Sequence, residues 1–183
     1  MMPATYRVPE TFNTERFVVR KALVSDAISV HRGWATDREV TRYLAWKPHS
    51  SMEQTVSFLE GAERAWQVGT SFPLLIARHT APDEIIGTVE PRSHQARVSY
   101  GWITRRDHWG QGVASEVVRW LVDHALAHPA IFRTEAMCDV ENIASSRVMV
   151  KAGMTREAVL RRYILHPNVS PEPRDAFLYC KVR

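Results

Sequence analysis

The sequence has 183 residues, of which 45% are hydrophobic and 24% are charged, with 24 basic against 20 acidic side chains. This length and balance are typical of one globular domain with a full core, and they exclude a disordered or fibrous chain. The net charge of +4 is small and scattered, which favours an anionic small molecule rather than nucleic acid as a partner.

The cysteines and the apolar segments indicate the cellular compartment of the protein. Cys138 and Cys180 are the only cysteines, and both lie in apolar, strand-like stretches, so we expect buried free thiols in a reducing compartment. No ligand spacing of His or Cys accompanies them, so we expect no metal. Residues 1–20 lack the apolar segment of a signal peptide, and no apolar run is long enough to span a membrane. These features predict a cytoplasmic protein without a membrane partner.

The first part of the chain predicts a strand, three helices and a strand hairpin. In chain order we expect a strand over 14–22, helices over 25–34, 37–44 and 52–67, strands over 71–79 and 84–91 joined by a turn at 81–84, and a strand over 97–104 after a connection at 92–96. Alternating hydrophobicity indicates the strands. Ser50 and Glu53 have the capping-box spacing that opens the third helix, and Gly69 closes it.

The second part predicts alternating helices and strands. We expect a helix over 113–128, a strand over 132–140, a helix over 143–152, and strands over 155–165 and 175–183 separated by a proline-containing loop. Apolar residues in the first of these helices recur with a period of about 3.6, as on a helix with one buried face. Asn142 suits an N-cap, and Gly153 suits a helix end. The order of elements predicts an α/β mixture around one sheet.

Two glycines, Gly110 and Gly112, lie where a predicted strand turns into a long helix. Glycine costs about 0.5–1 kcal/mol relative to alanine inside regular structure, so its use here suggests that something approaches the backbone closely. A phosphate held by the N–H groups of the helix start is one explanation. A tight turn that only reverses the chain is the other, and the spacing alone favours neither.

The stretch from Trp109 to Ala114, WGQGVA, resembles the signature Gln/Arg-x-x-Gly-x-Gly/Ala of the GNAT superfamily of acetyl-CoA-dependent N-acetyltransferases, with Trp109 in place of the usual first residue. The longer stretch HWGQGVASE, 108–116, is similar to the Rim-type branch, which includes ribosomal-protein-alanine N-acetyltransferases. A second block, from Asn142 to Met154, resembles the branch pattern N-x-x-S-x-x-(V/L)-x-x-K-x-G-F, with Met154 for phenylalanine. The likeness covers residues 14–183.

The resemblance implies a fold and an activity. It implies a GNAT domain over 14–183 behind an extension of 1–13, with a mixed, mostly antiparallel, twisted sheet of about seven strands, splayed at its centre and flanked by about four to five helices. The implied activity is transfer of the acetyl group of acetyl-CoA to a primary amine, by direct attack in a ternary complex. The amine would belong to a protein amino terminus or a small molecule, and the enzyme would be a monomer or homodimer. Transfer from another acyl-CoA and a non-catalytic CoA-binding role remain open alternatives.

The residues that the resemblance implies for acetyl-CoA lie on the strand before the glycines, in the glycine loop and on the helices that follow. They are Trp102, Ile103, Thr104, Trp109, Gly110, Gln111, Gly112, Val113, Ala114, Ser115, Asn142, Arg147 and Lys151. Amides of 111–115 would hold the pyrophosphate, and 102–104 would face the pantetheine arm. Arg147 and Lys151 are candidates for the phosphates, although for each of them taken alone the sequence favours a solvated surface cation.

The resemblance also implies a general base and a general acid. Glu90, followed by Pro91, matches a glutamate expected to take a proton from the amine, and Ser145 matches a serine expected to protonate the leaving thiolate. An exposed hairpin carboxylate and a locally bonded helix serine are the structural alternatives. Many GNAT enzymes place a tyrosine seven residues after the asparagine, but Met149 stands there in this chain. We expect His108 to be a surface residue.

The acceptor pocket is expected between the amino-terminal helices and the final hairpin. Tyr43, Trp46 and Tyr163 are the predicted substrate-binding aromatics, with Trp66 as a further candidate. An α-amine, with a pKa of about 8, is roughly one-tenth neutral at pH 7, whereas a lysine amine is neutral about once in 2,500 molecules. A weak carboxylate base therefore suits an α-amine better than a lysine.

Overall fold

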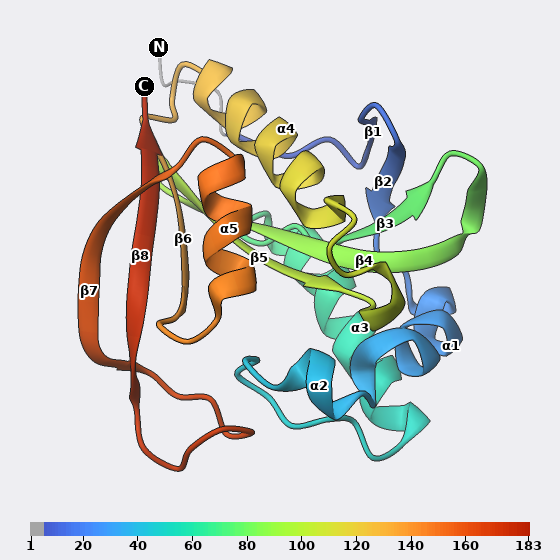
Figure 1. The fold of residues 1–183 in the computed structure, drawn as a ribbon. Coiled ribbons are helices and arrows are strands. Elements are labelled where there is room, and N and C mark those ends of the chain that lie inside the picture. Colours follow the sequence, from blue (N-terminus) through green and yellow to red (C-terminus); the bar gives the residue numbers. More distant parts are fainter. Residues whose placement is uncertain (1–5) are drawn as a thin grey trace.

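The computed structural model describes residues 6–183, which fold around one eight-stranded sheet in the order β1-β2-β3-β4-β5-β6-β8-β7 (Figure 1). The strands are β1 (Thr11–Asn13), β2 (Phe17–Lys21), β3 (Leu74–Arg78), β4 (Ala81–His94), β5 (Arg97–Thr104), β6 (Arg133–Asp139), β7 (Thr155–Ile164) and β8 (Arg174–Val182). The helices are α1 (Ala27–Val30), α2 (Arg38–Thr41), α3 (Met52–Val68), α4 (Val113–Ala127) and α5 (Ile143–Lys151). Only β5 and β6 run parallel to each other, so the sheet is mixed and mostly antiparallel, as predicted.

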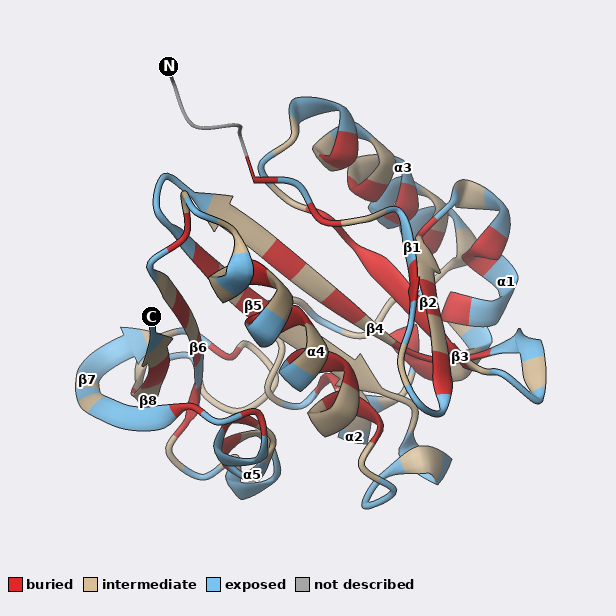
Figure 2. Ribbon diagram, turned by 90° about the horizontal axis from the view of Figure 1, so that it is seen from above, coloured by how far each residue is buried: buried red, intermediate tan, exposed pale blue. Residues whose placement is uncertain are grey.

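Both faces of the sheet are covered, which gives the domain two cores (Figure 2). Alternate residues of one strand serve opposite faces: Phe17 and Val19 pack on the α4 side, and Val18 packs on the side of α1 and α3. The apolar stripe of α4 is buried along its whole length. The sheet therefore fixes the positions of the two sequence motifs, residues 108–116 and 142–154. Among residues 6–183 no helix is long and apolar enough to cross a membrane.

The sheet splits between its two parallel strands. β5 and β6 pair only from Arg97 to Tyr100 against Arg133 to Ala136, and both strands then continue without pairing to each other. The N–H of Arg105 donates to Ile86 O (2.9 Å), so the backbone N–H and C=O groups of Arg105 face β4. Because these groups alternate along a strand, those of Ile103 face β4, and those of Trp102 and Thr104 face the split. The predicted splay is confirmed, and it leaves an open strand edge.

The elements expected from the sequence are confirmed, with corrections at the hairpin. β4 begins at Ala81, which pairs with Arg78, so the turn is at residues 79–80 and not at 81–84. Pro82 fits within a strand here because the β3–β4 register is irregular at this end, where a missing N–H is tolerated. The far end of β4 reaches His94, so the connection is also shorter than 92–96.

The amino-terminal region also differs from expectation. Residues 1–5 of the expected extension lie outside the described residues, but Tyr6, Val8 and Phe12 are buried in the α4-side core. β1 pairs with β2 and adds the eighth strand, so residues 6–13 belong to the domain. Ser51, one residue after the predicted Ser50, is the N-cap of α3.

Candidate active site

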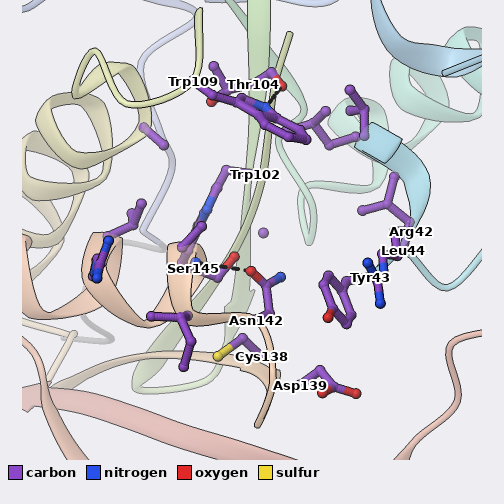
Figure 3. Close-up of a pocket in the computed structure, with 18 of the residues that line it drawn as sticks. Arg42, Tyr43, Leu44, Trp102, Thr104, Trp109, Cys138, Asp139, Asn142 and Ser145 are labelled. Atoms are coloured by element: carbon purple, nitrogen blue, oxygen red, sulfur yellow. Dashed lines mark hydrogen bonds between the residues drawn. The ribbon is translucent and has the colours of Figure 1, made fainter. Parts of the chain in front are cut away.

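A cleft of about 700 Å³ opens where β5 and β6 separate (Figure 3). Its walls come from the segment after α2, the end of β5, the glycine loop with the start of α4, the end of β6, α5, and the end of β7. Four stretches of the sequence, 39–44, 100–115, 137–151 and 164–166, therefore meet where the sheet is open.

The glycine loop forms one end of the cleft. Gly110 and Gly112 have φ values of 74° and 78°, in the left-handed region that side chains disfavour. Gly112 is the N-cap of α4 and offers no capping side chain, so the first N–H groups of the helix, at Val113 to Ser115, have no intrahelical partner. A Cβ on Gly110 would meet no atom within 4 Å, so contacts inside the protein do not require this glycine. This end of the cleft has the chemistry of an anion site.

Side-chain hydrogen bonds from inside and outside the motif hold the glycine loop in shape. Arg16 donates to Gln111 O (3.0 Å) and pairs with Glu116 through Nε and Oε2 (2.6 Å). The side-chain amide of Gln111 is also hydrogen-bonded. Its Oε1 accepts from Arg78 (2.5 Å), and its Nε2 donates to Asp107 O (2.9 Å). Gln111 therefore shapes the loop with its side chain and offers only its backbone to a ligand. Sequence reasoning missed Arg16 and Glu116, because nothing local signals a contact between residues 100 positions apart.

The open edge of β5 forms the middle of the cleft. Trp102, Ile103 and Thr104 all line it, but only Trp102 and Thr104 turn backbone groups to the split. The Ile103 side chain packs against the α1–α3 core, so its predicted backbone role is not supported. The Trp109 indole donates to Thr104 O (2.7 Å), which ties the loop to the strand edge. An extended polar chain could pair along this edge.

The start of α5 forms the opposite wall. Asn142 Oδ1 accepts from the N–H of Ser145 (3.1 Å), as an N-cap does, and Figure 3 shows Trp102 reaching toward Ser145 and Tyr43 facing Asn142. The Ser145 hydroxyl lines the cleft and makes no hydrogen bond within residues 6–183. Arg147 and Lys151 lie exposed on the same helix at the cleft. The two basic side chains therefore lie within reach of an anion bound in the cleft.

The predicted base Glu90 is not at the cleft. Its carboxylate accepts two hydrogen bonds from Arg92 (2.9 and 2.7 Å) and one from Ser71 (2.6 Å), and it does not line the cleft. The cause is strand alternation, because the neighbouring Val89 points into the α4-side core and Glu90 therefore points to the opposite face of the sheet. The structure thus brings Ser145 to the cleft and leaves Glu90 in an ion pair elsewhere.

Not all of the aromatic residues that were predicted to bind the acceptor lie at the cleft. Tyr43 lines the cleft, whereas Trp46 packs against His49 (4.7 Å between ring centroids) and Phe58. Tyr163 is 57% exposed on β7, away from the cleft. Trp66 is in the core and donates to Pro73 O. Hydrophobic spacing does not distinguish a core aromatic from a cleft aromatic, and of these four only Tyr43 lies at the cleft.

A buried polar group lies at the end of the cleft away from the glycine loop. Asp139 accepts from Arg174 Nε (2.5 Å) and from the Glu141 N–H (2.8 Å). Burial raises the pKa of Asp139, but these hydrogen bonds and the Arg174 charge outweigh it and hold the pKa below its ordinary value. His166 lies beside it, with Nε2 3.9 Å from Asp139 Oδ2, and its ring meets Tyr43 edge-on. No sequence motif pointed to Asp139 or His166.

Cys138 and His108 also line the cleft. Cys138 contacts Ser146 (3.3 Å between Sγ and Oγ), and burial raises the pKa of its thiol, which favours the protonated form. His108 lines the cleft and its side chain is only 13% exposed, so the expectation of a surface histidine is wrong. Within residues 6–183, no three His, Cys, Asp or Glu side chains are grouped as a metal site would need.

The chain is similar to known acetyltransferases in sequence and in fold. The family described as the acetyltransferase (GNAT) domain matches residues 16–155. The uncharacterized N-acetyltransferase YoaA of Bacillus subtilis (strain 168) is 29% identical over 175 residues, which covers 93% of this chain and 96% of that protein.

Two solved structures share the fold. One is the microcin C7 self-immunity acetyltransferase MccE in complex with acetyl-CoA and AMP, with a TM-score of 0.84 and 21% identity over 96% of this chain and 98% of that chain. The other is RimL, the ribosomal L7/L12 α-N-protein acetyltransferase, in complex with coenzyme A, with a TM-score of 0.82 and 20% identity over 94% of this chain and 98% of that chain.

Proposed function

The chain belongs to the GNAT acetyltransferase family, and we propose that it transfers the acetyl group of acetyl-CoA to the primary α-amine of a small molecule or a protein amino terminus. The relatives are named N-acetyltransferases, so the enzyme class itself follows from the family. The acceptor and the placement of acetyl-CoA are the parts that we propose here.

The observation that carries the proposal is the continuity of the cleft. Unpartnered N–H groups at the start of α4 suit the pyrophosphate, and the open β5 edge at Trp102 and Thr104 suits the amides of pantetheine. Continuing in the same direction, the cleft reaches Ser145 and then Tyr43. A thioester extended along this path would place its carbonyl at the junction between the cofactor end and the acceptor end.

The chemistry is a direct transfer between two bound substrates. The neutral amine forms a bond to the thioester carbonyl carbon, and the charge that develops on the carbonyl oxygen is stabilised by an N–H of the open strand edge. The carbon–sulfur bond then breaks, the amine nitrogen loses one proton, and the thiolate gains one. Ser145 is placed to donate that proton, because its hydroxyl is at the cleft and unengaged.

The nature of the cleft favours an α-amine. Glu90 lies elsewhere, and Asp139 is held by Arg174, so within residues 6–183 no strong carboxylate base is free at the buried acceptor end. An α-amine, with a pKa of about 8, reaches its neutral form with much less help than a lysine amine. The description of RimL as an α-N-protein acetyltransferase concerns that protein, and it is in keeping with this proposal.

The first test measures binding and turnover on the whole protein. Acetyl-CoA should raise the melting temperature in a concentration-dependent way, whereas NAD and ATP should do much less. Thiol release should then be followed over a panel of α-amino amides, short peptides with free amino termini, polyamines and lysine side chains. We expect turnover with α-amines and slow or no turnover with lysine side chains. Stabilisation by NAD but not acetyl-CoA would contradict the cofactor, and exclusive use of lysine would contradict the acceptor class.

A further inference from the structure

We propose that His166 is the general base of the reaction, taking the proton that the acceptor amine loses when it attacks the thioester. The proposal rests on the acetyl transfer proposed above and deepens it by assigning the proton's destination. His166 follows β7 directly and lines the acceptor end of the cleft.

The environment of His166 is unusual for a structural histidine. Its side chain is only 2% exposed, and within residues 6–183 neither ring nitrogen has a hydrogen-bond partner of normal geometry. A buried polar group without a partner costs free energy, so its retention calls for an explanation such as catalysis. The ring is held by Tyr43 on one side (5.8 Å between centroids) and by Asp139 on the other. Tyr43 and Asp139 therefore fix the ring at the wall of the cleft, and both ring nitrogens are buried there without a hydrogen-bond partner of normal geometry from residues 6–183.

The charges around His166 keep it neutral and ready to accept a proton. The ionisable groups that face it are Asp139 on β6, Arg174 on β8 and Tyr43 after α2. Burial lowers the pKa of His166, and Asp139 and the Leu44 backbone oppose this shift without cancelling it. Near neutral pH the imidazole is thus unprotonated, and the nearby Asp139 carboxylate stabilises the imidazolium once it forms.

The other ionisable groups at the cleft are less suitable. Asp139 is bound by Arg174, and Glu141 also pairs with Arg174 (2.9 Å). Glu39 is exposed on α2, so water competes with the amine for its carboxylate. His108 follows β5 next to the glycine loop, at the end assigned to the cofactor. Only His166 combines burial, an unengaged nitrogen and a place at the acceptor end.

The proton movements balance as follows. The amine nitrogen bonds to the carbonyl carbon and one N–H proton passes to a ring nitrogen of His166, directly or across one water. The carbon–sulfur bond breaks, and the thiolate takes a proton from Ser145, whose hydroxyl is restored from solvent. The imidazolium then loses its proton to solvent, so the products are the acetamide and coenzyme A as a thiol.

The test is the pH–rate profile of H166Q, measured with a good α-amine at saturating acetyl-CoA. General bases contribute about 10²–10⁴-fold, so we expect kcat/KM for the amine to fall at least about a hundredfold near pH 7. Below about pH 6.5 the wild-type profile should have an acidic limb that is steeper than protonation of the amine alone explains. H166Q should lose this additional dependence, and raising the pH should partly restore its rate as more amine becomes neutral. H94Q is the matched control, because His94 is exposed at the end of β4 and does not line the cleft, and this variant should keep both the acidic limb and the rate.

Binding of acetyl-CoA by calorimetry separates this proposal from the proposed function. H166Q should bind acetyl-CoA within about twofold of the wild type, because His166 lies at the acceptor end. Wild-type rates and an unchanged profile in H166Q would overturn the base, whereas failure of the wild type to bind acetyl-CoA would overturn the proposed function. If H166Q does not fold, an NMR titration of His166 in the wild type replaces it. A His166 pKa that does not match the acidic limb of the rate would then overturn the proposal.

Discussion

Glu90 and Arg92 form an ion pair on β4 that does not line the cleft. At the scale of single residues we therefore predict that Glu90 is not the general base that the family resemblance implies. The Glu90→Gln change should leave kcat and KM within about twofold, because the carboxylate faces Arg92 and Ser71 and not the cleft. Stability should fall by no more than about 1 kcal/mol, as for other half-exposed ion pairs. Steady-state kinetics and thermal melts would measure both effects.

Ser145→Ala is the comparison for that variant. We expect kcat to fall about tenfold, or about 1.4 kcal/mol in activation free energy, with little rescue at high pH. The loss should stay modest because a thiol with a pKa of about 8.5 leaves without much acid help. A large loss in Glu90→Gln together with none in Ser145→Ala would show that the two assignments should be exchanged.

At this scale the sequence predicted the cofactor end of the site better than the acceptor end. Gly110, Gly112, Asn142 and Ser145 lie within two short motifs, and local spacing suffices to find them. His166 lies in a loop without a motif, and its role depends on contacts with residues far away in the chain. Glu90 was misplaced because the face on which a strand residue points depends on register, which the strand's own sequence does not reveal.

The elements were predictable because their signals are local. The period of α4, the Asn142 cap of α5 and the glycine ends of α3 and α5 all lie within a few residues of the element that they define. The three-residue β1 carries too few residues for a pattern. Contacts between elements, such as the Arg16–Glu116 pair that joins the β1–β2 turn to α4, could not be inferred this way.

That pair provides a prediction at the scale of elements. Glu116 accepts from Thr14 (2.7 Å) and from the Arg16 N–H (2.9 Å) and side chain, and Arg16 in turn holds Gln111 O. Glu116→Gln should loosen the glycine loop and weaken acetyl-CoA binding about tenfold, or about 1.4 kcal/mol, as measured by calorimetry. The half-burial of Glu116 limits the accompanying loss of stability.

The control for this variant lies on the same helix. Asp123 pairs with Lys181 (2.8 Å) near the other end of α4, so Asp123→Asn removes an ion pair of the helix without touching the loop. It should leave acetyl-CoA binding unchanged. Equal losses of affinity in the two variants would mean that α4 responds as a whole, and that Glu116 has no particular role in the loop.

The whole molecule is organised by the split in its sheet. The pairing of β5 with β6 stops after Tyr100, and this single interruption produces the open edge, the cleft and the meeting of α2, α4 and α5 around it. The splayed sheet was expected from the family resemblance and not from hydrophobic patterns, which do not report where two strands diverge. Its eight strands differ from the expected seven only by the short edge strand.

The central claim is that acetyl-CoA lies along the open edge of β5 with its pyrophosphate at the start of α4. Hydrogen–deuterium exchange of the intact protein, with and without saturating acetyl-CoA, tests this claim most directly. Within residues 6–183 the backbone amides of Trp102, Thr104 and 113–115 have no hydrogen-bond partner, so they should exchange quickly in the free protein and slow markedly when the ligand binds. Residues 177–180 of β8, which pair on both sides, should not change. Binding of acetyl-CoA without protection of 101–104 and 111–116 would contradict the claim.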